Sequence, residues 1–347
     1  MTAEPFLVVK DLKTHFSTTA GVVRAVDGVS FTLERGKALG IVGESGSGKS
    51  VLSRSIMGLL PGNNVIRSGS VRFDGQELMG RSRNEMRSFW GQRMAMVFQD
   101  PMTSLNPVMK IGKQVGEGLR RTLGMSKQDS IETAERLLAD VGIPEPARRL
   151  NEYPHQLSGG MRQRVTIATA LSCGPSLLFA DEPTTALDVT VQAQILDLLA
   201  AQQHDRNMSM ILVTHDLGVV AGRTDEIAVM YAGQIVERAP TASLFANMKM
   251  PYTEALMKSI PKLTDKAHTR LDSVGGRPPN LISPPTGCRF APRCPYVSER
   301  CLTEQPPLVE AVESPGHYFR CWYPVGSPEH TDAVRRRESL AALAGGN

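Results

Sequence analysis

Residues 43–50 read GESGSGKS and are the strongest structural signal in the sequence. They fit the phosphate-loop pattern GxxxxGK[ST] at every position, between an apolar run at 38–42 that predicts a strand and a segment at 51–60 with apolar residues at helical spacing. Glycines let backbone N–H groups turn toward a phosphate, and a helix N-terminus adds a favourable dipole. Lys49 is expected at the β- and γ-phosphates and Ser50 at Mg²⁺. The flanking segments disfavour the alternative, a glycine-rich turn with a chance lysine, so the sequence predicts a nucleoside triphosphate site.

Composition sets the broad class of the chain. The 347 residues carry ordinary apolar and charged fractions of 41% and 21%, and the net charge of +4 is too small to indicate nucleic acid. The N-terminus lacks the pattern of a signal peptide, and no apolar run approaches the ~20 residues of a membrane-spanning helix. We therefore expect a soluble, cytoplasmic α/β protein, unless another protein holds it at a membrane.

Two carboxylates follow a second apolar run. Leu177 to Ala180 predict a buried strand that delivers Asp181 and Glu182 at its end. Asp181 is placed to hold Mg²⁺ through water, and Glu182 to polarise an attacking water as general base. Adjacent acids at a strand end are often plain surface residues, but their position in a phosphate-loop protein favours the functional interpretation.

Other polar residues are expected at the same edge of the sheet. Gln99 ends a predicted strand at 94–98, and His215 follows another at 210–213. The carboxyl ends of strands are where open α/β sheets bind ligands. A lone histidine more often forms a structural hydrogen bond than it takes part in catalysis. The position of His215 at this sheet edge nevertheless favours a functional role.

Further elements frame the site. Strands are expected at 6–16 and 29–33, and Phe16 either offers its ring to an adenine or packs into the sheet. Residues 108–152 change to helical periodicity, which predicts an inserted helical subdomain. Ser158 suits the N-cap of a helix whose glycine-rich start is open to an anion, although a capped helix with no ligand fits equally.

Taken in order, these motifs resemble those of the ATP-binding-cassette ATPases over about residues 6–260. The resemblance implies a phosphate-loop NTPase core with a β-subdomain and a helical subdomain at about 108–172. It also implies a head-to-tail pair, in which the signature motif of one cassette closes over the ATP of the other. The signature residues are Leu157, Ser158, Gly159, Gly160 and Met161, where Met161 replaces the usual glutamine.

The resemblance also assigns roles by position. Glu182 is the implied catalytic base, assisted by Gln99 and His215, and Asp188 in the loop with Ala186 and Leu187 would couple the two sites. Magnesium is implied at Ser50, Gln99 and Asp181. The implied ATP-binding residues are Phe16, Gly43, Glu44, Ser45, Gly46, Ser47, Gly48, Lys49, Ser50 and Val51.

A narrower resemblance covers nearly the whole chain. The segments FQDPMTSLNP at 98–107, YPHQ at 153–156 and the tail with FAPRCP at 290–295 are similar to those of oligopeptide/dipeptide importer ATPases. This implies peptide import with a second, usually non-identical ATPase, two membrane permeases and an extracytoplasmic peptide-binding protein, at the cytoplasmic face of the membrane. Nickel complexes or glutathione are alternative cargoes. A soluble cassette protein acting on ribosomes or DNA is a weaker alternative.

The C-terminal segment, residues 261–347, is expected to form a proline-rich, loop-like extension with a flexible tail and little apolar core. Four of the five cysteines lie there: Cys288, Cys294, Cys301 and Cys321. Disulfides are disfavoured by compartment, and zinc sites usually show closer cysteine pairs. An iron–sulfur cluster tolerates wider spacing, and similar tails in the family have been associated with [4Fe–4S] clusters. We therefore expect a cluster first, zinc second and free thiols third.

Overall fold

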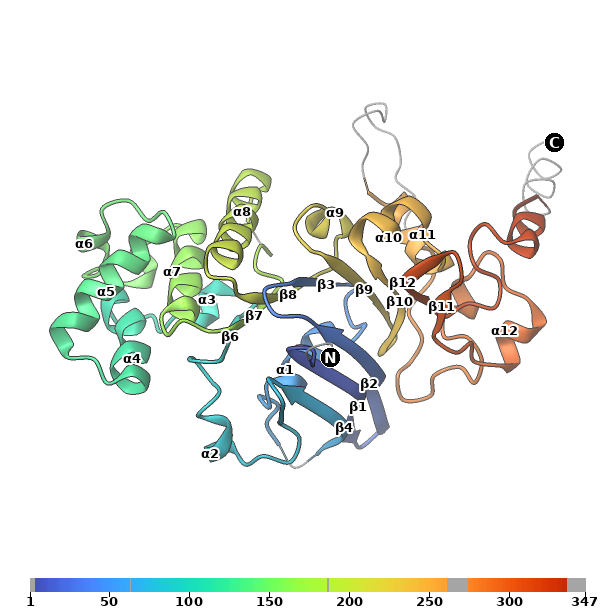
Figure 1. The fold of residues 1–347 in the computed structure, drawn as a ribbon, viewed down its shortest axis with the longest axis horizontal. Coiled ribbons are helices and arrows are strands. Elements are labelled where there is room, and N and C mark those ends of the chain that lie inside the picture. Colours follow the sequence, from blue (N-terminus) through green and yellow to red (C-terminus); the bar gives the residue numbers. More distant parts are fainter. Residues whose placement is uncertain (1–3, 63, 186, 261–273, 336–347) are drawn as a thin grey trace.

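The computed structural model describes residues 4–62, 64–185, 187–260 and 274–335. Figure 1 shows three groups of elements along the long axis of the molecule: a helical lobe at one end, two sheets in the middle, and the C-terminal extension at the other end. The flexible tail that the sequence predicts falls in part on residues 336–347, outside the described residues.

A mixed sheet of eight strands forms the centre of the protein. Strands β9, β3, β8, β7 and β6 run parallel, and β10, β12 and β11 continue the sheet with antiparallel pairs. In spatial order the strands are β11 (Val309–Ala311), β12 (Ser314–Phe319), β10 (Gln234–Pro240), β9 (Glu226–Tyr231), β3 (Ala38–Val42), β8 (Ser209–Thr214), β7 (Leu177–Asp181) and β6 (Met94–Val97).

Alternate residues of the central strands belong to two separate hydrophobic cores. On β3, Ala38 and Val42 pack with the helices on one face, whereas Leu39 and Ile41 pack against α1 and the smaller sheet on the other. This follows from the two-residue side-chain period of a strand. Because both faces of the parallel strands are covered, their sequences are continuously apolar, which is why they were predictable.

A second, antiparallel sheet forms the β-subdomain, in the order β2, β1, β4, β5. Its strands are β1 (Leu7–Thr18), β2 (Gly21–Leu33), β4 (Val65–Phe73) and β5 (Gln76–Glu77). Strand β2 is longer than the predicted 29–33, because it pairs with β1 from the Thr18–Gly21 turn onward. Cross-strand pairing, which local composition does not reveal, sets its start.

The helical lobe, residues 101–171, confirms the predicted change to helical periodicity and lies at one end in Figure 1. Helix α7 packs against α3, α4 and α5 and against strand β6. The helices from the chain start to α8 are α1 (Lys49–Ile56), α2 (Arg83–Met86), α3 (Pro101–Ser104), α4 (Ile111–Leu123), α5 (Lys127–Asp140), α6 (Pro146–Arg149), the 3₁₀ turn η1 (Pro154–Gln156), α7 (Gly159–Leu171) and α8 (Val189–Asp205).

The C-terminal extension, described over residues 274–335, packs onto the central sheet. Phe290 is buried against the rings of Tyr231 and Tyr252, at centroid distances of 5.3 and 5.4 Å. Among the described residues of the extension, Phe290 is the one buried member of the large core cluster, so the extension adds to the core of the cassette more than it builds a core of its own. The remaining helices are α9 (Leu217–Val220), α10 (Thr241–Asn247), α11 (Pro251–Lys258), η2 (Ala291–Arg293, a 3₁₀ turn) and α12 (Glu299–Thr303).

A buried hydrogen bond joins the hairpin formed by β11 and β12 to the cassette. His317 on β12 and Glu237 on β10 are both fully buried, with Nε2 of the histidine 2.7 Å from Oε1 of the carboxylate. Glu237 also accepts from the backbone N–H groups of Lys249 (2.5 Å) and Met250 (3.1 Å). The hairpin is thereby joined to both β10 and the start of α11.

In the described ranges, none of the helices combines the length and the apolar character that a membrane span requires.

Candidate functional site

The phosphate loop, residues 43–50, connects β3 to α1 in the predicted order. At Gly43 a Cβ would lie 2.1 Å from the carbonyl oxygen of Met230, and at Gly48, where φ is +103°, 2.1 Å from that of Ala25. Any larger residue at either position collides with backbone. At Gly46, φ is +79° and the space where a Cβ would lie is open. These glycines bring the main chain close enough to cradle a phosphate.

Lys49 lies inside this loop. Its side chain is 4% exposed, and Nζ donates to the carbonyl oxygens of Gly43 (2.7 Å) and Glu44 (3.0 Å). Burial lowers the pKa of Lys49, while the carboxylates of Glu182, Asp181 and Glu44 raise it. A buried cation at a helix N-terminus is the arrangement that a polyphosphate needs.

Ser50 and Asp181 meet at the ends of the loop and of β7. The Ser50 hydroxyl donates to Asp181 Oδ1 at 2.8 Å, and Asp181 is fully buried. Its other oxygen, Oδ2, has no hydrogen-bond partner in the described part of the chain, and burial raises the pKa of this carboxyl. Arg54 Nη2 is 3.9 Å from Oδ2. A hydroxyl beside a buried carboxylate with an unused oxygen fits Mg²⁺, a cation that prefers oxygen ligands.

Glu182 is the centre of a polar cluster at the same sheet edge. Its Oε2 accepts from Gln99 Nε2 (2.9 Å) and Thr185 Oγ1 (3.0 Å), and His215 Nδ1 lies 3.6 Å away. Its Oε1 is 4.0 Å from Lys49 Nζ. The residue has a φ of +46°, a conformation that is uncommon for a non-glycine residue and that recurs at functional sites. The structure thus brings Gln99, Glu182 and His215 together, as the strand ends predicted.

The signature residues lie elsewhere, at the start of α7. Leu157 is buried, and the Ser158 hydroxyl caps the helix by accepting from the backbone N–H of Met161 at 3.3 Å. A Cβ on Gly159 would approach Leu187 at 3.6 Å, and one on Gly160 would meet Val191 at 2.8 Å. The signature glycines therefore pack against the loop and helix that follow β7.

Two remaining predicted residues have local roles that the structure defines. Asp188 is the N-cap of α8, because its Oδ1 accepts from the backbone N–H of Val191 at 2.9 Å. Ala186, in the same loop, lies outside the described residues. Phe16 is half-buried near the end of β1, where it pairs with Val23 and Val65.

The prediction of an iron–sulfur cluster was wrong. The four cysteines line one small cavity and all are free thiols, but among the described residues no group of three or more His, Cys, Asp or Glu side chains is placed to hold a metal ion. Burial raises the pKa of the free thiols of Cys288, Cys294 (to about 12) and Cys321. The zinc alternative lacks support because it needs the same kind of ligand group, which the described residues do not provide.

Some contacts of the site were missed by sequence reasoning. The sequence assigned no role to Thr185 or Arg54, although each lies within four residues of a predicted site residue. Tyr252 Oη accepts from the backbone N–H of Glu44 at 3.0 Å, and Arg293 pairs with the Glu44 side chain. Nothing in the sequence signals these two, because they lie more than 200 residues from the loop.

Comparison with known families defines the class of the protein. The family model "ABC transporter" matches residues 26–185. Among solved structures, the ATP-binding cassette MJ0796, solved as a dimer bound to ADP and Pi, superposes with a TM-score of 0.61 at 26% identity, covering 68% of this chain and 98% of that one. The cassette cbiO1 of Clostridium perfringens gives a TM-score of 0.60 at 27% identity, covering 70% of this chain and 91% of that one.

Relatives that match nearly the whole chain define the branch of the family more closely. The model "Oligopeptide/dipeptide transporter, C-terminal region" matches residues 236–301. The dipeptide transport ATP-binding protein DppD of Lactococcus lactis is 48% identical, covering 93% of this chain and 92% of that protein. The oligopeptide transport ATP-binding protein OppD of Bacillus subtilis is also 48% identical, covering 91% and 88%. The chain therefore belongs to the ABC transporter ATPases, in the branch of the oligopeptide/dipeptide transport ATP-binding proteins, and it is an ATPase that binds ATP with Mg²⁺.

Proposed function

We propose that this ATPase powers the import of oligopeptides or dipeptides through a membrane ABC transporter. The observation that carries the proposal is the match of the C-terminal region to that transporter family, together with 48% identity over nearly the whole length of two peptide-transport relatives. Those relatives are named for peptides, which supports peptides over nickel complexes or glutathione as the cargo.

In the proposed chemistry, Glu182 is the general base. Gln99 and Thr185 donate to its Oε2, which fixes the orientation of the carboxylate. A positioned carboxylate accepts the proton of the attacking water. His215, which is largely exposed, would contact the transferred phosphoryl group.

The phosphates would lie along the phosphate loop, with Lys49 on the β- and γ-phosphates. Ser50, Asp181 and Gln99 would hold the magnesium ion. When bound, Mg²⁺ neutralises charge on the phosphate oxygens. Phe16, half-buried on β1 of the β-subdomain, would contact the adenine.

The site is proposed to be completed by a second cassette. Gly159 and Gly160 lie against Leu187 and Val191, so the signature and the Asp188 loop form one continuous surface. Val189 on that surface is 83% exposed, which an apolar residue at an interface would explain. In the head-to-tail pair, Ser158 at its helix N-terminus would face the γ-phosphate held by the partner, and Asp188 would couple the two sites.

The permease is proposed to dock on the helical lobe. A groove of about 550 Å³ lies there, with four cations and one carboxylate among its lining residues. A cytoplasmic permease helix that carries acidic side chains would complement this charge. The charged lining residues are Lys110, Lys113, Arg120, Lys127 and Glu135. This docking would hold the chain at the cytoplasmic face of the membrane, beneath two permeases fed by an extracytoplasmic binding protein.

Uptake in cells tests the cargo. A strain that lacks this chain is complemented with the wild type or with Glu182→Gln, and uptake of labelled di- and oligopeptides, nickel and glutathione is measured. Peptide uptake restored only by the wild type supports the proposal. Restoration of nickel or glutathione uptake without peptide uptake contradicts it.

A further inference from the structure

One arginine of the extension reaches the phosphate loop. Arg293, at the end of η2, donates from Nη1 to Glu44 Oε2 at 2.6 Å and from Nη2 to Glu44 Oε1 at 2.9 Å. The arginine side chain is 3% exposed and that of Glu44 is 26% exposed. A bidentate pair of this kind is among the strongest polar contacts in proteins, and its geometry is specific to arginine.

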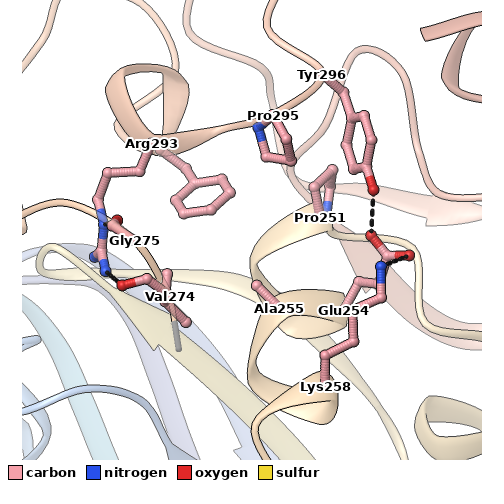
Figure 2. A pocket seen from close by; sticks show the side chains of 10 residues that line it. Pro251, Glu254, Ala255, Lys258, Val274, Gly275, Arg293, Pro295 and Tyr296 are labelled. Atoms are coloured by element: carbon pink, nitrogen blue, oxygen red, sulfur yellow. Dashed lines mark hydrogen bonds and ion pairs between the residues drawn. The ribbon is translucent and has the colours of Figure 1, made fainter. Parts of the chain in front are cut away.

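Other contacts hold Arg293 in this orientation. Nε donates to the carbonyl oxygen of Gly275 at 2.7 Å, Nη2 to that of Val274 at 2.8 Å, and Nη1 to Tyr231 Oη at 3.3 Å. Figure 2 shows the arginine side chain extended along one wall of a cavity toward Val274 and Gly275. The guanidinium is therefore placed in advance to receive the Glu44 carboxylate.

Glu44 is the second residue of the phosphate loop, so a negative charge on its side chain is unfavourable for binding phosphate. Its own carbonyl oxygen accepts from Lys49 Nζ at 3.0 Å, and its charge is one of those that raise the pKa of Lys49. The carboxylate thus acts electrostatically on the group expected to bind phosphate. An unpaired negative charge there would repel the triphosphate.

We propose that Arg293 is a positioning residue of the ATP site: by pairing with Glu44 it neutralises a carboxylate beside the bound polyphosphate and so raises the affinity for nucleotide. The extension then contributes to ATP binding, although it holds none of the nucleotide-binding motifs. The inference rests on the ATPase activity of the chain and is independent of which solute is transported.

A double-mutant experiment on the full chain tests this role. The dissociation constants of MgADP and of the slowly hydrolysed MgATPγS are measured by calorimetry for the wild type, Arg293→Gln, Glu44→Gln and the double variant. Arg293→Gln should weaken binding about tenfold, the effect of one like charge several ångströms away near a protein surface. Glu44→Gln should bind at least as tightly as the wild type, since it leaves no carboxylate that needs to be neutralised.

The double variant separates electrostatics from packing. Arg293→Gln combined with Glu44→Gln should restore the affinity of the wild type, because no carboxylate is left unpaired. A purely structural arginine would leave the double variant as weak as Arg293→Gln, and that result overturns the proposal. Arg300→Gln is the matched control, because Arg300 belongs to the extension but pairs with Glu304 and stacks on Trp322. The nucleotide affinity of Arg300→Gln should equal that of the wild type.

The proposal can still be tested if the Arg293→Gln variant does not fold. If Arg293→Gln fails to fold, Glu44→Gln alone decides, because weaker nucleotide binding by that folded variant contradicts the repulsion on which the proposal depends. Thermal unfolding of each nucleotide-free variant is recorded in parallel, so that affinity is compared only among folded proteins.

Discussion

Gln99 Nε2 donates to Glu182 Oε2 across 2.9 Å and thereby joins the ends of β6 and β7. The two residues are 83 positions apart in the chain. Their strands are neighbours in the parallel sheet, paired from Met94 and Leu177 to Val97 and Ala180. The sheet register therefore delivers a carboxylate and the amide that orients it to one point, beside the phosphate loop.

This relationship makes Glu182→Gln the first test of the chemistry. The amide keeps the size of the side chain but accepts a proton poorly, so hydrolysis should fall at least about a hundredfold while nucleotide still binds. Phosphate release and MgATP binding are measured together. Glu145→Gln, a change at an exposed surface pair with Arg148, is the control and should hydrolyse normally. Undiminished hydrolysis by Glu182→Gln would show that another group is the base.

Asp181→Asn should change the magnesium requirement. The substitution removes the negative charge from the buried group whose Oδ2 has no hydrogen-bond partner among the described residues. Because ligand-orienting carboxylates typically contribute 10–100-fold to metal affinity, the Mg²⁺ concentration for half-maximal hydrolysis should rise about tenfold or more. Magnesium titrations of ATPase activity measure this. Asp197→Asn, at an exposed pair with Arg223, should leave the titration unchanged. An unaltered midpoint for Asp181→Asn would remove Asp181 from the metal site.

Phe290→Ala tests whether the extension is part of the cassette core. Phe290 is 1% exposed and packs against Tyr231 and Tyr252. The lost ring should cost about 3–5 kcal/mol of unfolding free energy, and the whole chain should still unfold in one transition. Chemical denaturation followed by circular dichroism gives both quantities. Leu302→Ala, at an exposed position of α12, is the control. A separate early transition, or no loss of stability, would show that the extension folds apart from the cassette.

Lys113→Glu tests the proposed permease groove. Reversing one of the four cations should weaken complementarity to an acidic helix, so less permease should co-purify with the chain. Nucleotide binding should be unchanged, because the groove lies in the helical lobe and away from the phosphate loop. Lys10→Glu, at an exposed position of β1, is a charge-matched control. Full co-purification of the permeases with Lys113→Glu would place the docking surface elsewhere.

The sequence predicted most of the central fold and the strand-end cluster, because these depend on local patterns. Apolar strands are continuous where both faces are buried, and polar residues such as Gln99, Glu182 and His215 follow the strands directly. The phosphate loop was recognisable because its glycines are required by close backbone contacts, as at Gly43 and Gly48.

Contacts between residues far apart in the chain could not be predicted from the sequence. The pair formed by Glu44 and Arg293 spans 249 positions, and no periodicity connects them. The same limit explains why the prediction of an iron–sulfur cluster was wrong. The number and spacing of the cysteines were compatible with a cluster, but spacing does not reveal ligand geometry or burial. The packing of Phe290 into the cassette was missed because loop-like composition does not indicate which surface a loop covers.

The most direct measurement is transport by the assembled complex in lipid vesicles. The wild-type ATPase is reconstituted with the proposed partner ATPase, permeases and binding protein, and MgATP hydrolysis and movement of a labelled peptide are followed together. We predict that peptide moves only with MgATP and that both activities stop with Glu182→Gln. Peptide movement that continues with Glu182→Gln, or ATP hydrolysis by the wild-type complex that never moves peptide, would contradict the account.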